Sequence, residues 1–94
     1  MTRPYTEKVI FQAPDRIGVE RTFSKDVEEE ELVWHRDRED RYVWTENKTD
    51  WEFQLDNEIP RLLDKNYIFI PKGTYHRIVK GDGELTLRVL KYRK

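Results

Sequence analysis

The sequence predicts an all-β domain, built as a small antiparallel β-barrel or jelly roll. Short segments with the apolar or alternating pattern of strands recur about every 8–12 residues along the chain. No segment has the apolar period of a long amphipathic helix. Only 36% of the residues are hydrophobic, but three Trp, five Tyr and four Phe are among them. Rings of this size bury enough area to form a core.

The first third of the chain predicts two strands followed by an acidic segment. Residues 9–11 are apolar, and residues 14–18 contain the Pro and Gly of a turn. Residues 19–23 alternate between apolar and polar side chains, which is typical of a strand with one buried face. Residues 24–31 are almost entirely charged or polar and end in four consecutive Glu. A solvated loop is the favoured interpretation, and a short helix capped by Ser24 is the alternative.

The middle of the chain predicts three further strands, at residues 32–35, 41–44 and 51–55. The last of them alternates cleanly, with Trp51, Phe53 and Leu55 on one face. Turn-forming residues separate the strands at 45–50 and follow the third at 56–58.

The last third predicts four strands, of which the first is short. They are expected at residues 61–63, 67–70, 75–79 and 84–89. The final strand places Leu85, Leu87 and Val89 on one face and polar side chains on the other. This pattern is typical of a sheet with one wet side.

Composition excludes several classes of protein. Charged residues make up 39% of the chain, against about 25% in an average domain. The 18 Lys and Arg nearly balance the 19 Asp and Glu, so there is no basic surface for nucleic acid. The absence of Cys excludes disulfides and thiolate metal sites. No apolar run has the length of a membrane span or a signal peptide, so we expect a soluble cytoplasmic domain.

Two segments together resemble the paired motifs of a known family. Residues 67–76 form an apolar strand ending in Pro71-x-Gly73-x-x-His76, which resembles the second conserved motif of the cupins. Residues 32–43 resemble the first cupin motif, in which His-x-His and a following Glu precede an aromatic-Val strand. The chain is thus identified as a small single-domain cupin of the RmlC-like superfamily, with a degraded first motif. The resemblance implies one domain over 1–94, with N-terminal strands and acidic loop at 1–31 and the barrel portion at 32–90.

The resemblance implies a divalent metal at the mouth of the barrel, bound by His35, Glu39 and His76. Asp37 stands where the second His of the motif is expected, and Glu39 best fits the motif's Glu in a loop two residues shorter. Side chains alternate along a strand, so His35, Asp37 and Glu39 are expected on one face. Asp37 is therefore a further ligand, and Asp40 is the alternate if the register slips by one. Such nitrogen and oxygen ligands suit Fe, Mn, Ni or Zn.

Other residues are candidates for contacting a substrate. Asp37 could act as a base instead of a ligand, and Arg41 could orient an anionic group, with salt bridging to nearby carboxylates as its alternative. Gln54 faces the barrel mouth in one strand register and solvent in the other. Tyr75 and Trp44 could line a cavity, whereas core packing or a dimer contact is the commoner role of such rings.

These observations lead to two hypotheses about function. The first is a metal-dependent enzyme acting on a small polar molecule, with dioxygenase-type oxidation ahead of isomerisation. The second is a non-catalytic cupin module that binds a small molecule or a protein partner. A homodimer is also expected, because so small a barrel exposes sheet edges.

Overall fold

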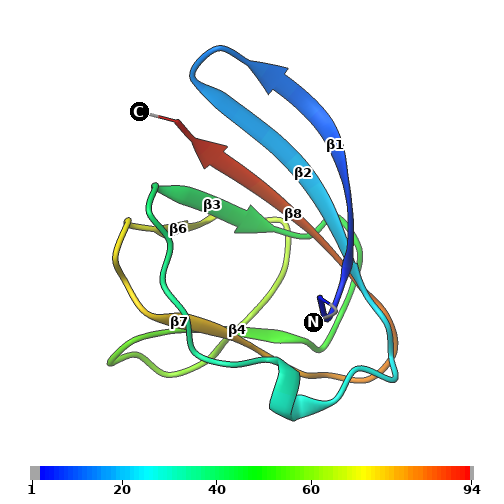
Figure 1. Ribbon diagram of the computed structural model, residues 1–94. Helices are drawn as coiled ribbons and strands as arrows, with labels where there is room; N and C mark the ends of the chain where they lie inside the picture. The colour runs from blue at the N-terminus through cyan, green and yellow to red at the C-terminus, as the bar shows by residue number, and fades with distance from the viewer. Residues whose placement is uncertain (1–2, 94) are drawn as a thin grey trace.

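The computed structural model, in which residues 3–93 are described, consists of two antiparallel sheets that face each other (Figure 1). The larger sheet has five strands in the order β1-β2-β8-β3-β6, and the smaller has three in the order β5-β4-β7. The strands are β1 (Thr6–Ala13), β2 (Arg16–Phe23), β3 (Arg41–Trp44), β4 (Glu52–Leu55), β5 (Arg61–Leu62), β6 (Ile68–Ile70), β7 (His76–Val79) and β8 (Leu85–Tyr92). The all-β antiparallel prediction is confirmed.

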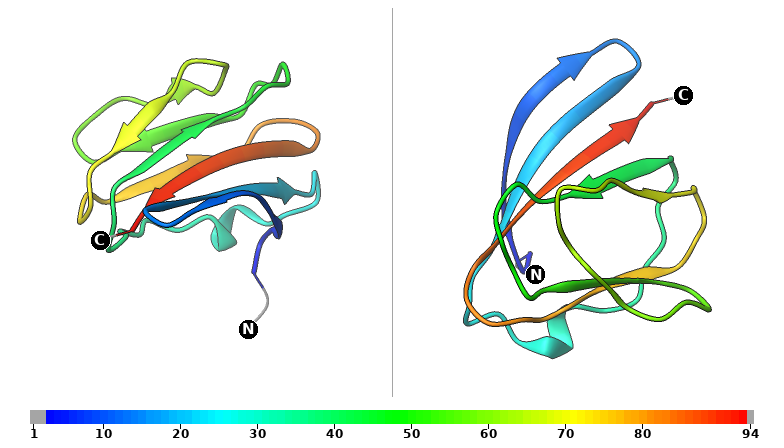
Figure 2. Two further views of the ribbon diagram at one scale, coloured as in Figure 1. Left: turned by 90° about the horizontal axis from the view of Figure 1, so that it is seen from above. Right: turned by 180° about the vertical axis from the view of Figure 1, so that it is seen from behind.

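The core lies between the two sheets (Figure 2). Alternation along each strand fixes which residues face it, because successive side chains point to opposite faces. On β8 the predicted face is buried, with Leu85, Leu87 and Val89 each no more than 2% exposed. The buried apolar residues are Val19, Phe23, Val27, Val43, Trp51, Phe53, Leu55, Leu63, Ile68, Ile70, Leu85, Leu87 and Val89.

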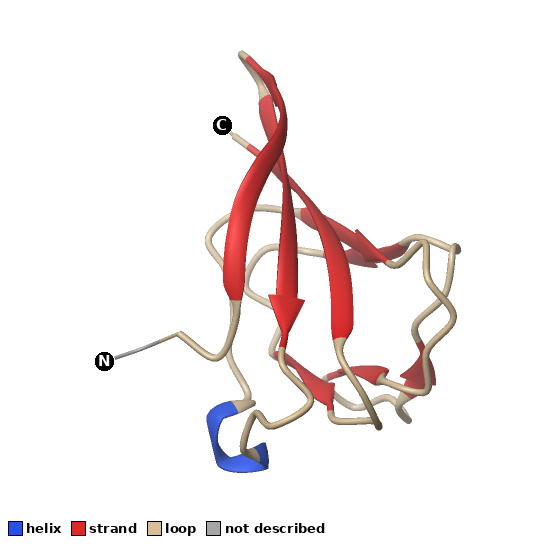
Figure 3. Cartoon of the chain, turned by 90° about the vertical axis from the view of Figure 1, so that its right-hand side faces the viewer, coloured by secondary structure: helices blue, strands red, loops and turns tan. Residues whose placement is uncertain are grey.

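The acidic segment is mostly loop and contains one short 3-10 helix, η1 (Glu29–Glu31) (Figure 3). Glu28 and Glu31 cap this helix reciprocally, since the Glu28 backbone N–H donates to Glu31 Oε2 at 3.2 Å. The hydroxyl of Ser24 instead accepts from the Asp26 backbone N–H, which closes a turn. Among residues 3–93, no helix has the length and apolar character needed to cross a membrane.

The strand predicted at residues 32–35 is wrong. This segment makes only one isolated bridge, between His35 and His76. The physical reason is that its apolar side chains do not share a face. Leu32 packs against the core, whereas Val33 and Trp34 are 60% and 41% exposed. The segment therefore crosses the end of the barrel as a loop whose backbone, among the described residues, pairs with β7 only at His35.

One edge of the five-stranded sheet is apolar and exposed. Strand β1 pairs only with β2, and its Val9, Ile10 and Phe11 are each at least 44% exposed. An edge of this kind can pair with another chain. Homodimerisation stays a prediction. Sedimentation at tens of micromolar is expected to give a dimer, and a monomer under those conditions would contradict it.

Candidate metal centre

A tight corner between β6 and β7 positions His76. Gly73 has φ 79°, a left-handed conformation that glycine adopts without strain. The corner is tied to the loop before β3, because the Gly73 backbone N–H donates to Asp37 O at 2.9 Å and the Lys72 N–H donates to Asp40 Oδ1 at 2.8 Å. These bonds hold the two motif segments side by side, so that His76 and Asp37 lie close together.

The two histidines lie side by side at the end of the barrel. Their backbones exchange two hydrogen bonds, with N···O distances of 3.0 and 2.9 Å, and their ring centroids are 4.2 Å apart. Nδ1 of His35 lies 3.1 Å from Val33 O, and Nδ1 of His76 lies 2.8 Å from Thr74 O. A carbonyl oxygen can only accept, so both Nδ1 atoms are protonated and Nε2 keeps the lone pair in each neutral ring. This second hydrogen bond is typical of histidines that bind metals.

Asp37 completes a group of three. His35, Asp37 and His76 each offer one ligand atom within 4.8 Å of the others. Asp37 Oδ2 lies 3.1 Å from His76 Nε2 and 3.3 Å from Arg41 Nε, yet it is buried and makes no contact with hydrogen-bond geometry among residues 3–93. Two atoms bound to one metal ion lie about 2.8–3.6 Å apart at tetrahedral or octahedral angles. The residues present therefore fit a divalent cation, which would satisfy both Oδ2 and Nε2.

The surroundings of Asp37 and His35 favour the protonation states that bind metals. Burial alone would raise the pKa of Asp37, but the His76 ring, whenever its Nε2 carries a proton, and the Arg41 guanidinium outweigh burial and hold the pKa below its ordinary value. Burial lowers the pKa of His35, and neighbouring His76 adds to this lowering, while the Val33 carbonyl and Asp37 oppose it. A carboxylate and a neutral imidazole are the protonation states that ligate a metal.

The structure does not bring Glu39 or Asp40 to this group. The chain bends after Asp37, so the strand-like alternation expected through Glu39 ends there. Glu39 Oε1 instead accepts hydrogen bonds from Arg41 Nε and Nη2, at 3.2 and 2.9 Å. The Asp40 carboxylate accepts a hydrogen bond from the Lys72 backbone N–H, in the corner between β6 and β7. Arg41 lines the cavity beside the group and bridges Asp37 and Glu39, which is the salt-bridging alternative raised for it.

Three of the residues predicted to contact substrate, Gln54, Trp44 and Tyr75, are not among the residues that line the cavity beside the group. Gln54 faces outward between buried Phe53 and Leu55, and its side chain bonds to Glu58 O and Arg77. Trp44 lies on the outer face of β3 and packs on Tyr67, with ring centroids 4.5 Å apart. Tyr75 is 44% exposed and lies under the Arg36 guanidinium. Strand alternation explains the positions of Gln54 and Trp44. Their neighbours on the same strands, Phe53 and Val43, are buried, so Gln54 and Trp44 point to the opposite face.

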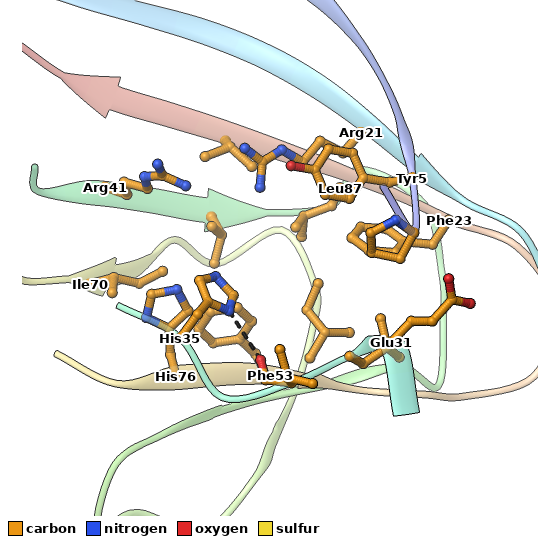
Figure 4. Close-up of a pocket in the computed structure, with 16 residues that line it drawn as sticks. Tyr5, Arg21, Phe23, Glu31, His35, Arg41, Phe53, Ile70, His76 and Leu87 are labelled. Carbon is orange, nitrogen blue, oxygen red and sulfur yellow. Dashed lines mark hydrogen bonds between the residues drawn. The ribbon is translucent and has the colours of Figure 1, made fainter. Parts of the chain in front are cut away.

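The histidines open onto a cavity of about 250 Å³ between the sheets (Figure 4). Most of its wall is apolar, with Phe23, Phe53 and Leu87 among the lining residues. Three polar residues of this wall were not predicted from the sequence as site residues, namely Tyr5, Arg21 and Glu31. The signal for Arg21 was present, since it alternates with Val19 and Phe23 on the buried face of β2.

Lys91 lies on the inner face of β8, at the end of the row formed by Leu87 and Val89. Burial lowers its pKa, and the Arg21 and Arg41 guanidinium groups lower it further, against the raising effect of Glu7 and Glu39. Charging Lys91 thus costs more in the folded state than in the unfolded state. Between the lowered pKa and the ordinary value near 10.5, the unfolded chain binds more protons, so stability rises with pH across that interval.

Replacing Lys91 with Met removes the cost of burying this charge and is therefore expected to stabilise the protein at pH 7. The advantage of the variant should shrink as the pH rises towards 10, because wild-type Lys91 then loses its proton. Urea unfolding of both proteins at pH 7 and pH 10 measures how the difference in their free energies of unfolding changes with pH. Tyrosine ionisation near pH 10 affects both proteins alike, so it cancels in this difference. A stability difference that does not change with pH would contradict the assignment.

The chain forms a two-sheet antiparallel barrel with two His and a carboxylate clustered at its end, and solved structures of other proteins share this fold. Neither models of known families nor curated sequences match this chain. An RmlC-like cupin from Shewanella frigidimarina superposes with a TM-score of 0.78, at 14% identity, covering 100% of this chain and 80% of that one. A cupin domain from Bordetella pertussis gives 0.69, at 17% identity, covering 100% and 99%. The DMSP lyase DddQ from Ruegeria pomeroyi gives 0.71, at 11% identity, covering 97% and 47%.

The chain is thus a small domain with the fold of the RmlC-like cupins, as the two motif segments predicted. The lack of a matching family model agrees with the degraded first motif, in which Asp37 replaces a histidine.

Proposed function

We propose that this protein is a metal-dependent cupin enzyme that acts on a small molecule, with oxidation by dioxygen as its reaction type. The observation that carries the proposal is the buried Asp37 Oδ2, which faces His76 Nε2 at 3.1 Å without a hydrogen bond. Two histidines and one carboxylate are the ligand set of non-haem iron oxygenases, and they also suit Mn, Ni and Zn. When bound, such an ion supplies open positions at which substrate or dioxygen can be activated.

The protein's own residues would prepare the site in three ways. The carbonyls of Val33 and Thr74 fix the orientation of the two imidazole rings. Arg41, bonded to Glu39, holds the Asp37 carboxylate in its deprotonated form and in place. The apolar wall around Phe53 and Leu87 excludes water from the substrate, which strengthens electrostatic interactions at the site.

Oxygen consumption by the Fe(II)-loaded protein, with a panel of small organic acids and polar molecules, tests the proposal. We expect substrate-dependent uptake that His76→Ala abolishes. A protein that binds metal and a small molecule, yet consumes no oxygen and changes no substrate, would support the non-catalytic cupin module instead. The solved structure of a lyase with this fold favours including elimination and isomerisation products in the readout.

A further inference from the structure

One charged side chain faces the cavity from the strand opposite the histidines. Arg21 belongs to β2, and its side chain is only 12% exposed. It alternates with the buried Val19 and Phe23, so it faces the interior. Arg21 and Tyr5 lie on one side of the cavity, and His35 and His76 lie on the other (Figure 4). A guanidinium in such a position needs either a full set of partners or a ligand.

The guanidinium of Arg21 is held in place, but only some of its N–H groups donate hydrogen bonds within the described residues. Its Nε donates to Glu7 Oε1 at 2.6 Å, and its carbon lies 4.4 Å from the centre of the Tyr5 ring. Within residues 3–93, no acceptor receives a hydrogen bond from its two terminal nitrogens. Glu7 and Tyr5 thus fix the plane of the group and leave the terminal edge free. That edge matches a carboxylate, because its two N–H groups can donate in parallel.

The surrounding charges favour an anion at this wall. Arg41 also lines the cavity, and Lys91 lies close enough to Arg21 and Arg41 for both to lower its pKa. The nearby carboxylates Glu7 and Glu39 are each bonded to an arginine, and Glu31, which also lines the cavity, accepts a hydrogen bond from the Glu28 backbone N–H. Between Arg21 and the histidines, the wall is made of apolar side chains such as Phe23, Phe53 and Leu87. The cavity thus has the free edge of Arg21 on one side, an apolar middle and the histidines, with Arg41 beside them, on the other side.

We propose that the cavity binds a small carboxylic acid with an apolar body, whose carboxylate is bound by the terminal nitrogens of Arg21. The volume of about 250 Å³ limits the ligand to a small molecule, since drug-sized ligands occupy about 300–1,000 Å³. The end of the ligand remote from the carboxylate lies against His35 and His76. This last point rests on the proposed function, whereas the role of Arg21 does not.

Calorimetric titration with phenylacetate and with phenylacetamide, its neutral analogue of the same shape, tests the inference. Both ligands are added to zinc-loaded and to EDTA-treated protein. We expect saturable binding of phenylacetate, at least about 10-fold tighter than that of the amide. Arg21→Gln should remove this preference in both forms of the protein, and Arg21→Lys should retain part of it. Arg88→Gln is the control, since Arg88 lies on the outer face of β8.

Glu7→Gln separates ligand binding from a purely structural role. Both Glu7→Gln and Arg21→Gln break the ion pair between the two residues, but only Arg21→Gln removes the guanidinium. We expect Glu7→Gln to bind phenylacetate as tightly as wild type or more tightly. Equal losses in the two variants would overturn the inference, as would wild-type affinity in Arg21→Gln or equal binding of acid and amide. If the protein binds no metal, the EDTA-treated series still decides the role of Arg21, so the two proposals fail separately.

Discussion

Replacing His76 with Ala, or Asp37 with Asn, is expected to abolish tight binding of divalent metal ions. Each change alters one of the three ligand atoms that cluster within residues 3–93. Loss of an outer-shell partner alone typically costs about 10- to 100-fold in metal affinity, so loss of a direct ligand should cost about 100-fold or more. Competition titrations with a chromogenic chelator measure the affinity. Asp37→Asn keeps the shape of the side chain, so it tests the ligand role even if His76→Ala unfolds the buried end of the barrel.

Glu39→Gln is the matched control for these variants. The resemblance to the first cupin motif implied that Glu39 is a ligand, whereas the structure bonds its carboxylate to Arg41. Glu39 reaches the site through Arg41, which contacts Asp37, so it lies one contact further from the metal than an outer-shell partner. We therefore expect a loss of no more than about 10-fold, below the usual effect of an outer-shell change. A loss as large as that of Asp37→Asn would contradict the assignment of Asp37, rather than Glu39, as the carboxylate ligand.

Replacing Trp51 with Ala is expected to cause the largest loss of stability of any single change in the core. Trp51 is fully buried, its ring packs against Phe23 of the opposite sheet at 5.8 Å, and its Nε1–H donates to Asp82 O at 3.2 Å. Truncating a buried Trp costs about 3–5 kcal/mol. The free energy of unfolding of a domain is about 5–15 kcal/mol in total, so the variant should be barely folded or unfolded. Urea unfolding followed by circular dichroism measures the loss.

Two further variants keep this prediction testable if Trp51→Ala does not fold. Trp51→Phe retains a ring and loses the hydrogen bond to Asp82, so its loss should be intermediate. Trp34→Ala removes a ring that is 41% exposed and contacts the Arg77 guanidinium, so its loss should be about 1 kcal/mol or less. Equal destabilisation by Trp34→Ala and Trp51→Phe would contradict the claim that Trp51 contributes more to stability than Trp34.

Most of the fold could be predicted from local patterns in the sequence. Alternation identifies the buried faces of β2, β4 and β8, and the Pro71-x-Gly73-x-x-His76 corner places β6 before β7. The segment at residues 32–35 could not be assigned in this way. Its apolar content is that of a strand, but whether it pairs depends on how the whole chain crosses the end of the barrel. Only the tertiary structure shows that, among the described residues, its backbone pairs with β7 at His35 alone.

The site was predictable where it depends on motif positions and was not where it depends on loop geometry. His35, Asp37 and His76 stand at motif positions, and the structure groups them. Glu39 was expected to share their face. The chain instead bends between Asp37 and Asp40, and both of these residues accept hydrogen bonds from backbone N–H groups of the corner at residues 71–74. The alternation of β2 places Arg21 on the buried face, so its position could be predicted. The free terminal edge of its guanidinium could not, because it depends on contacts with Glu7 and Tyr5 that only the structure shows.

Metal analysis of protein purified without a histidine tag tests the central claim most directly. The protein is stripped with a chelator, reconstituted separately with Fe(II), Mn, Ni and Zn, and desalted before the metal is quantified. We predict about one equivalent of at least one of these metals, held by His35, Asp37 and His76. Less than about 0.1 equivalent of every metal after reconstitution would mean that these three residues do not form a metal site.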